Sequence, residues 1–472
     1  MEDLDYDFVI VGGGSAGVTA AGFAAQLGVR VALVEKHRIG GDCTWTGCVP
    51  SKALLKAAKV VHEMRSASQY GLPAYNAKVD LQQVMTRVHD AIDEVYQAES
   101  PEVLAEHSVD VYWDTAHFVD ADSLTIGDRR LKARRVLLTT GASPFVPPIT
   151  GLAGVDFLTY EDIWDLEVLP ERFVAVGAGP IGCEMAQAFH RLGSQVTLIE
   201  ALDRILPNEE PEVSQLVGQI FANEGIHLCL GMTVEQVWQD EAGIHLVSGE
   251  NEVVGDALLI AIGRRPNVEG LGLEQAGIDY SAKGIAVNDN LQTSQRHVYA
   301  AGDCTGGFQF THYAGWQAFM ATRNALLPGA ATGIAGRIPW ATFTDPEVAR
   351  VGLSEAQARD QYGSDFQVCE WPMNQVDRAI TDHHANGFIK IIHKPDGTLL
   401  GTTIVADRAG EMIHEWAVAM EHDLKLGDIA KVIHVYPTYS MAAQQATAEI
   451  QLEKLLAGTS GRLIRGMTRL IR

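Results

Sequence analysis

Residues 7–36, DFVIVGGGSAGVTAAGFAAQLGVRVALVEK, combine an apolar strand, a glycine-rich turn, an amphipathic helix and a second apolar strand that ends at Glu35. This order is typical of a βαβ unit. Gly12, Gly14 and Gly17 fill the Gly-x-Gly-x-x-Gly positions that allow a tight turn, a close approach of pyrophosphate to the helix N-terminus, and tight packing of helix on strand. Glu35 stands where a ribose 2′-hydroxyl needs an acceptor. The segment therefore predicts a dinucleotide-binding site.

The same pattern returns in residues 172–207, RFVAVGAGPIGCEMAQAFHRLGSQVTLIEALDRILP. Gly177, Gly179 and Gly182 precede the predicted helix, and Glu200 ends the second predicted strand. Two such units predict two bound dinucleotides. A carboxylate at Glu200 accepts from a free ribose hydroxyl and repels a 2′-phosphate, so the second site is expected to prefer NADH over NADPH.

Length and charge limit the classes of protein that remain. The 472 residues are too many for a single core and predict about three domains. The formal net charge of -24 disfavours binding to nucleic acid or to anionic lipid. An acidic N-terminus without a basic signal-peptide region predicts a cytoplasmic protein, and glycines interrupt the apolar stretch at 8–34, which disfavours a transmembrane helix.

Two closely spaced cysteines, Cys43 and Cys48, come just before a predicted helix. In a regular helix, Cα atoms five residues apart lie roughly 8.6 Å from each other, beyond the ~7 Å limit for a disulfide. The chain is therefore expected to bend between them, and Gly47 permits the bend. A helix N-terminus favours the nucleophilic thiolate, so the pair is predicted to be redox-active. The other cysteines are interpreted as packing residues: Cys183, Cys229, Cys304 and Cys369.

Five motifs carry a resemblance that spans nearly the whole chain: GGDCTWTGCVPSK, VAVGAGPIGCEMA, LLIAIGRRPN, VYAAGDCTG and VYPTYS. They resemble the class I pyridine nucleotide-disulfide oxidoreductases, a family that includes dihydrolipoyl dehydrogenase, glutathione reductase and mercuric reductase, and especially the mercuric-reductase-like members. The resemblance implies an α/β fold with two Rossmann-like domains, for FAD and NAD, and a C-terminal α+β dimerisation domain. The implied bounds are 1–149 with 267–338 for FAD, 150–266 for NAD, and 339–472 for a homodimer interface that completes the partner's active site.

The resemblance also implies roles for individual residues. Cys48 would lie against the flavin as the charge-transfer thiol, and Cys43 would be the interchange thiol that meets the substrate. Lys52 would pair with Glu184 near flavin N5. The implied FAD contacts are Gly12, Gly14, Gly17, Glu35, Lys36, Gly41, Lys52, Thr140, Gly141, Asp303, Thr311 and His312, and the implied NAD contacts are Gly177, Gly179, Gly182, Glu200 and Gly263.

The stretch HVYPTYSM at 434–441 departs from the family pattern. Members that act on small disulfides usually carry His-Pro-Thr with a glutamate three residues later, and here Tyr436 and Met441 take the histidine and glutamate positions. An unperturbed tyrosine has a pKa near ~10 and is a poor base at neutral pH. Efficient turnover of lipoamide or glutathione is therefore not expected, and His434 is interpreted as structural.

The mercuric reductase pattern is also incomplete, because the chain lacks that group's paired cysteines at the extreme C-terminus. No resident metal site is predicted, although the thiolates of Cys43 and Cys48 could bind a soft metal acceptor. The basic tail GRLIRGMTRLIR at 461–472 is interpreted mainly as a docked or frayed terminus, with membrane-surface contact as the alternative.

The leading interpretation is an NADH:acceptor oxidoreductase in which electrons pass through flavin to the Cys43–Cys48 disulfide, with reverse flow equally compatible with the sequence. Two alternatives remain. Electrons could pass from flavin directly to a quinone or oxygen without the thiols. The chain could also be a low-turnover redox or NADH sensor that acts on a partner protein.

Overall fold

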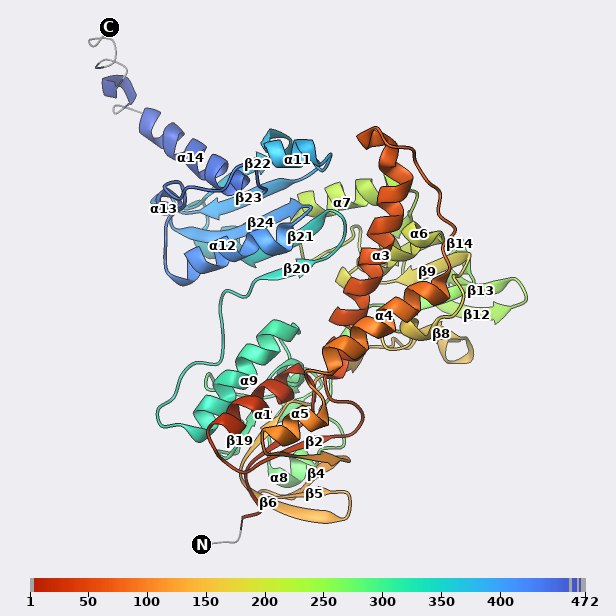
Figure 1. Ribbon diagram of the computed structural model, residues 1–472, viewed down its shortest axis with the longest axis vertical. Helices are drawn as coiled ribbons and strands as arrows, with labels where there is room; N and C mark the ends of the chain where they lie inside the picture. The colour runs from red at the N-terminus through yellow and green to blue at the C-terminus, as the bar shows by residue number, and fades with distance from the viewer. Residues whose placement is uncertain (1–3, 458–460, 465–466, 468–472) are drawn as a thin grey trace. The chain divides into compact units, whose positions relative to one another are not determined.

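The computed structural model describes residues 4–457, 461–464 and 467. The chain forms two compact units, each described here by itself (Figure 1). Unit 1 contains the chain up to Glu63 together with Asn76–Ala201 and Met232–Ala335. Unit 2 contains Met64–Tyr75, Leu202–Gly231 and the chain from Gly336 onward. Within the described residues, no helix is both long enough and apolar enough to span a membrane.

A parallel sheet lies at the centre of the first half of unit 1. Its strands run in the order β3-β2-β1-β6, and β19 pairs with β6 in the same direction. Buried parallel strands joined by crossover helices are typical of dinucleotide-binding folds. β5 and β4 continue from β6 as antiparallel strands. The bounds are β1 Tyr6–Val11, β2 Val31–Glu35, β3 Val109–Trp113, β4 Ala116–Asp120, β5 Ser123–Ile126, β6 Arg129–Leu138 and β19 Val298–Ala300.

Two helices rich in alanine pack together in this half, α1 (Ser15–Gln26) and α9 (Thr311–Leu326) (Figure 1). Ala20 of α1 and Ala318 of α9 are fully buried in one apolar cluster, and their small side chains allow the two helices to approach closely. Further α-helices of this region are α2 Gly41–Trp45, α3 Cys48–Ser66, α4 Leu81–Tyr96, α5 Pro101–Glu106 and α8 Leu273–Ala276.

A second parallel sheet in unit 1 repeats the architecture. Its strands in this unit run in the order β10-β9-β15-β8, and α6 connects β9 to β10. An antiparallel meander, β12-β13-β14, and a short antiparallel pair, β7 with β16, accompany it. The bounds are β7 Ala142–Pro144, β8 Phe157–Leu158, β9 Arg172–Val176, α6 Pro180–Leu192, β10 Gln195–Glu200, β12 Gln236–Asp240, β13 Gly243–Ser248, β14 Asn251–Gly255, β15 Ala257–Ile260 and β16 Arg264–Pro266.

Unit 2 is built on an antiparallel sheet in the order β20-β21-β24-β23-β22 (Figure 1). Its apolar core includes the fully buried Trp416 of α12. The bounds are α7 Pro211–Glu224, β11 His227–Leu230, β20 Trp340–Thr342, β21 Glu347–Gly352, α10 Glu355–Tyr362, β22 Gln367–Pro372, α11 Asp377–Thr381, β23 Phe388–His393, β24 Leu399–Ala406, α12 Ala409–Glu421, α13 Leu426–Ile429 and α14 Met441–Leu456.

Buried ion pairs join the 202–231 segment to this sheet. The ammonium of Lys390 in β23 lies 3.5 Å from Glu210, 3.0 Å from Glu212 and 2.9 Å from Glu355. A buried charge is tolerated only where it is paired, so these contacts fix the segment in place.

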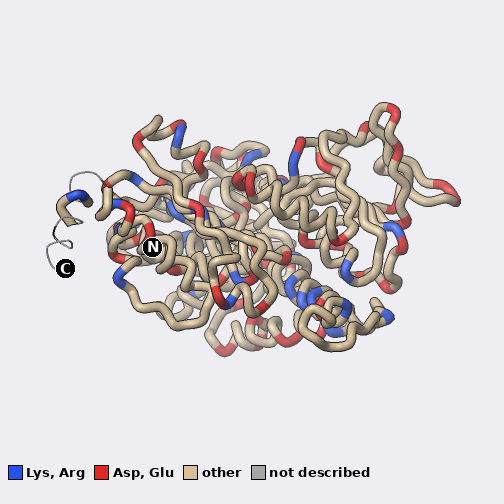
Figure 2. The backbone as a smooth tube through the Cα atoms, turned by 90° about the horizontal axis from the view of Figure 1, so that it is seen from above, with Lys and Arg blue, Asp and Glu red and all other residues tan. Residues whose placement is uncertain are grey.

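Two parallel sheets with glycine turns and an antiparallel C-terminal sheet confirm the predicted fold class. The pairing of β19 with β6 supports the predicted return of the chain to the first sheet, while the domain bounds themselves remain a prediction. Asp and Glu are spread along the described backbone of this acidic chain (Figure 2). Of the basic tail predicted at 461–472, residues 465–466 and 468–472 lie outside the described residues.

Candidate redox site

The segment that carries Cys43 and Cys48 folds as two helices with a bend between them. Cys43 lies in α2, the chain leaves helical geometry after Trp45, and Cys48 is the first residue of α3. A Cβ added to Gly47 would lie 2.8 Å from the carbonyl oxygen of Asp42, so this glycine is needed for a close backbone approach rather than for a left-handed conformation. All six cysteines lie in the described part of the chain, and none of them is joined in a disulfide there.

The two thiols differ in acidity. The pKa of Cys48 is lowered to about 6, chiefly by a hydrogen bond from the Cys43 thiol, with help from Thr311 and the positive charge of Lys52. The pKa of Cys43 is raised by the same hydrogen bond and by burial. The hydroxyl of Thr311 lies 3.4 Å from the Cys48 sulfur. These shifts favour a thiolate on Cys48 and a thiol on Cys43 in the reduced pair.

An ion pair lies beside the thiols and joins two helices. The Lys52 ammonium, one turn along α3 from Cys48, lies 3.0 Å from the Glu184 carboxylate of α6. Glu184 is buried, and its negative charge acts to raise the pKa of Cys48 whereas Lys52 lowers it. The structure thus brings together Cys43, Cys48, Lys52, Glu184 and Thr311, whose roles remain a prediction.

A charged junction next to Cys43 was not predicted from the sequence. The guanidinium of Arg264 binds Asp303 at 2.6 Å and also binds Asp42, which precedes Cys43. Burial acts to lower the pKa of Arg264, but Asp303, Tyr160 and Asp42 outweigh it and raise that pKa. The available signal in the sequence was the acid Asp42 in the motif GGDCTWTGCVPSK and the arginine pair at 264–265 in the motif LLIAIGRRPN.

The first glycine turn is shaped to receive a phosphate. A Cβ atom added to Gly12 would lie 2.4 Å from the carbonyl oxygen of Thr139, and one added to Gly17 would lie 1.9 Å from the carbonyl oxygen of Gly12. Both glycines therefore allow the backbone to pack closely. A Cβ atom added to Gly14, in contrast, would meet only one described atom within 4 Å beyond its chain neighbours, the Cα of Gly41 at 3.9 Å. Among the described residues, no side chain caps α1, whose N-terminus is therefore suited to a pyrophosphate.

Glu35 ends β2, and hydrogen bonds hold its carboxylate in the position expected for binding a ribose hydroxyl. Its carboxylate accepts hydrogen bonds from the backbone N–H of Gly13 at 2.6 Å and of His37 at 2.7 Å. A carboxylate has about four acceptor positions, so ribose hydroxyls can still bind. These features fit FAD.

The second turn repeats this geometry. A Cβ atom added to Gly177 or Gly182 would lie 2.5 Å or 1.8 Å, respectively, from a backbone carbonyl oxygen. A Cβ atom added to Gly179 or Gly263 would have no described atom within 4 Å beyond its chain neighbours. Glu200 accepts from the backbone N–H of Ala178 at 2.7 Å. The turn therefore fits a second dinucleotide.

The other implied FAD contacts come from several elements. Gly41 packs against Gly14, and an added Cβ there would lie 2.8 Å from the Gly14 Cα. Thr140 donates to the carbonyl of Asn267 at 2.6 Å, Gly141 has positive φ, and Lys36 is exposed.

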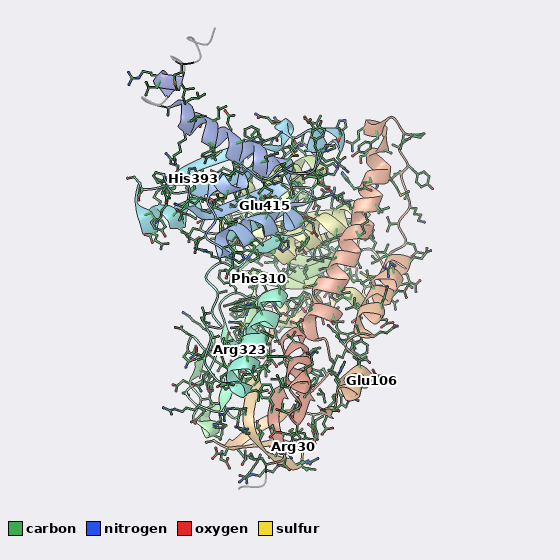
Figure 3. All side chains as sticks on the ribbon, turned by 60° about the vertical axis from the view of Figure 1, so that its left-hand side comes forward. Arg30, Glu106, Phe310, Arg323, His393 and Glu415 are labelled. Atoms are coloured by element: carbon green, nitrogen blue, oxygen red, sulfur yellow. The ribbon has the colours of Figure 1, made fainter. Side chains whose placement is uncertain are left out.

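Thr311 and His312, two of the implied FAD contacts, begin α9 directly after Phe310, which Figure 3 labels near the start of that helix. The ring of His312 stacks on Phe310 with centroids 5.5 Å apart. The N-terminal end of α9 thus carries the hydroxyl that contacts Cys48.

Tyr436 and His434 lie in unit 2 and are both engaged. The Tyr436 hydroxyl donates to Asp377 at 2.7 Å, and this hydrogen bond raises the pKa of Tyr436 further above its ordinary value. His434 contacts the Val432 carbonyl at 3.1 Å and the carboxylate of Glu415, labelled on α12 in Figure 3, at 2.8 Å. Both ring nitrogens of His434 are thus engaged, which supports the predicted structural role.

His384 lies beside two aspartates in unit 2. Its Nδ1 lies 3.0 Å from Asp407, and Asp345 completes a group whose ligand-type atoms lie within 4.8 Å of one another. Arg408 lies 3.7 Å from Asp407, so the acids of this group are balanced by nearby positive charge.

Two family models match the chain. Residues 6–318 match the pyridine nucleotide-disulphide oxidoreductase model, and residues 338–447 match the dimerisation domain of the same family. A mercuric reductase from Lysinibacillus sphaericus is 35% identical over 93% of this chain and 81% of its own length. A dihydrolipoyl dehydrogenase from Bacillus subtilis (strain 168) is 34% identical over 93% of this chain and 97% of its own length.

Solved structures of similar proteins agree with these matches. The HOCl-induced flavoprotein disulfide reductase RclA from Escherichia coli has a TM-score of 0.85 at 29% identity, covering 94% of this chain and 99% of its own. LpdA from Mycobacterium tuberculosis has a TM-score of 0.86 at 29% identity with the same coverage. The chain therefore belongs to the pyridine nucleotide-disulphide oxidoreductase family, whose enzymes use FAD and NAD(P)H.

Proposed function

We propose that this enzyme oxidises NADH and delivers the electrons, through Cys43 and Cys48, to a soft metal ion such as Hg(II) or Cu(II). The observation that carries the proposal is the geometry of the cysteine pair: Cys48 begins α3 one turn before Lys52 and lies 3.4 Å from the Thr311 hydroxyl. This setting lowers the pKa of Cys48, whereas the pKa of Cys43 is raised. When bound, FAD supplies the chemistry that takes a hydride from the nicotinamide and passes two electrons to a disulfide. Reduction of a Cys43–Cys48 disulfide would consume two electrons and one proton, leaving a Cys43 thiol and a Cys48 thiolate.

The proton on Cys43 favours a metal acceptor over a small disulfide. Attack on a disulfide requires the Cys43 thiolate and therefore a base, and neither Tyr436 nor His434 is suited to that task. A soft metal ion displaces the thiol proton by binding the sulfur. A homologue is named mercuric reductase, and the E. coli flavoprotein has been solved as a Cu(II) complex at 28% identity.

The proposed reactions balance. Two copper ions give NADH + 2 Cu(II) → NAD⁺ + H⁺ + 2 Cu(I), and mercury gives NADH + Hg(II) → NAD⁺ + H⁺ + Hg(0). A small disulfide would instead take up a proton: NADH + H⁺ + RSSR → NAD⁺ + 2 RSH. The metal reactions release a proton, so the absence of a histidine at position 436 costs them less than it costs the disulfide reaction.

The nicotinamide preference is part of the proposal. Glu200 presents its carboxylate beside the second glycine turn, where a 2′-phosphate would meet negative charge. Replacing Glu200 by serine should raise kcat/KM for NADPH by about tenfold or more relative to NADH, since one such repulsion is worth on the order of 1.4 kcal/mol. An unchanged ratio would show that Glu200 does not select the nucleotide.

The acceptor is tested by following NADH oxidation with Hg(II) presented as a thiol complex, Cu(II), lipoamide, glutathione disulfide and a soluble quinone. We expect the metal ions to be reduced, with activity lost in Cys43→Ser and Cys48→Ser but kept in Cys369→Ser, a matched substitution in β22 outside the site. Faster turnover of lipoamide or glutathione disulfide would overturn the metal proposal. Quinone reduction that survives both site substitutions would overturn the thiol route.

A further inference from the structure

Arg264 lies at a junction of four side chains in unit 1. Its Nη1 donates to Asp303 at 2.6 Å, its Nη2 binds Asp42, and its Nε donates to the Tyr160 hydroxyl at 3.1 Å. The Tyr160 hydroxyl in turn donates to Asp42 at 3.2 Å, and the guanidinium lies 5.3 Å from the Tyr160 ring centroid. One cation therefore holds two carboxylates and a phenol in a single arrangement.

The segment that carries Tyr160 also supports the turn between Cys43 and Cys48, which we call the cysteine turn. The indole of Trp164 donates to the backbone carbonyl of Thr46 at 2.9 Å and to that of Tyr160 at 2.7 Å. Tyr160 thus contacts Asp42, directly before Cys43, and Trp164 contacts Thr46, two residues before Cys48. The turn between the two thiols is fixed at both ends by residues far away in the sequence.

These contacts connect the thiols with the group expected to bind FAD. Asp303 is one of the implied FAD contacts, and Arg264 links it to the residue adjacent to Cys43. A shift of the Arg264 side chain would therefore move Asp42 and the Cys43 thiol together. Tyr160 limits that shift, because it is buried and its hydroxyl is hydrogen-bonded to both Asp42 and Arg264.

We propose that Asp42 and Tyr160, acting through Arg264, are positioning residues that set the orientation of the Cys43 thiol toward Cys48. This inference rests on the proposed function and deepens it. Without the junction, the Cys43 thiol should no longer donate a well-directed hydrogen bond to Cys48. Cys48 would then lose the main stabilisation of its thiolate, and transfer of electrons to the acceptor would slow.

The test compares Asp42→Asn and Tyr160→Phe with Asp256→Asn, which removes the same charge from another Asp–Arg pair of unit 1, formed with Arg172. Each FAD-loaded enzyme is reduced anaerobically with one equivalent of NADH, and the long-wavelength thiolate-to-flavin absorbance is followed against pH. Asp42→Asn should raise the pH midpoint of that absorbance and lower kcat for acceptor reduction by about tenfold or more, because small misplacements of reacting groups are costly. Tyr160→Phe should also raise the pH midpoint and lower kcat, but by smaller amounts than Asp42→Asn.

The outcomes separate the inference from the proposed function. Wild-type enzyme without the long-wavelength absorbance would contradict the proposed function itself. Wild-type absorbance with an Asp42→Asn midpoint and kcat equal to those of Asp256→Asn would overturn the positioning role alone. If Asp42→Asn fails to retain FAD, Tyr160→Phe decides the question, since it removes a single oxygen, and an unshifted midpoint would overturn the inference.

Discussion

Cys43 and Cys48 are the same kind of side chain, and their neighbours make them chemically different. Cys48 begins a helix, receives a hydrogen bond from Cys43 and lies near the positive charge of Lys52, whereas Cys43 is partly buried and keeps the shared proton. A thiolate is the reactive form of cysteine, so this difference decides which sulfur reacts with added reagents.

The pH dependence of Cys48 alkylation follows directly. In the reduced, FAD-free protein, the rate of Cys48 alkylation by iodoacetamide should rise as pH increases through about 6 and then level off. Cys43→Ala removes the main hydrogen bond and should move that midpoint upward, toward the ordinary value for a thiol. The measurement is the alkylation rate by peptide mass spectrometry, with Cys369→Ser as the matched control. A Cys43→Ala midpoint equal to the wild-type value would contradict the assigned cause.

The sequence predicted the reactive residues better than their supports. Cys43, Cys48 and Lys52 lie in one continuous motif, so their local spacing was readable. Asp42 and Arg264 are 222 positions apart, and their contact depends on how β16 meets the cysteine turn. Hydrophobic periodicity does not encode such a contact, and for this reason the junction appeared only in the structure.

At the scale of elements, two glycine turns place helix N-termini where phosphates can bind. Each turn has positions that are crowded by backbone and a position that is open. In the second turn, Gly177 has positive φ and meets the Ala261 carbonyl, whereas Gly179 has φ of -73° and faces open space among the described atoms. The crowded glycines hold the fold, and the open one borders the expected ligand.

Two alanine substitutions separate these roles. Gly177→Ala should destabilise the protein by about 2 kcal/mol or more, because a Cβ would lie 2.5 Å from a carbonyl oxygen. Gly179→Ala should cost about 1 kcal/mol or less yet weaken NADH binding, because its methyl group would project toward the pyrophosphate. Thermal unfolding and NADH titration of the FAD-loaded variants provide the measurements. Equal NADH affinity in Gly179→Ala and wild type would contradict the placement of the second cofactor.

The elements themselves were largely predictable from sequence. Both βαβ units and the helix that follows the cysteine pair are predictable from periodicity and glycine placement, whereas the helix start at Thr311 was implied only by the family resemblance. The pairing of β19 with β6 and the Lys390 contacts with the 202–231 segment join distant parts of the chain. Tertiary packing decides such pairings, so the sequence pattern alone did not predict them.

At the scale of the whole molecule, the dimerisation domain carries an exposed apolar loop. Ile433 is 92% exposed and Val435 is 77% exposed, next to Tyr436. Exposed apolar residues in a cluster are typical of protein interfaces. We predict that this loop is covered by a second copy of the chain, as the matched dimerisation domain suggests.

Ile433→Asp should convert the dimer to a monomer in light-scattering chromatography, because a buried unpaired charge is costly at an interface. Val168→Asp, at a residue 76% exposed in unit 1, is the matched control and should leave the mass unchanged. NADH should still produce the long-wavelength thiolate-to-flavin absorbance in the FAD-loaded monomer, while acceptor reduction should fall. A dimeric Ile433→Asp enzyme would show that the loop is not part of the interface.

The central claim is that electrons pass through the Cys43–Cys48 pair, and an anaerobic titration of the FAD-loaded enzyme with NADH tests it most directly. We predict that two electrons produce a long-wavelength absorbance from the Cys48 thiolate against oxidised flavin, and that Cys48→Ser abolishes it. Direct bleaching of the wild-type flavin by the first two electrons, without that absorbance, would show that the thiols are not in the electron path.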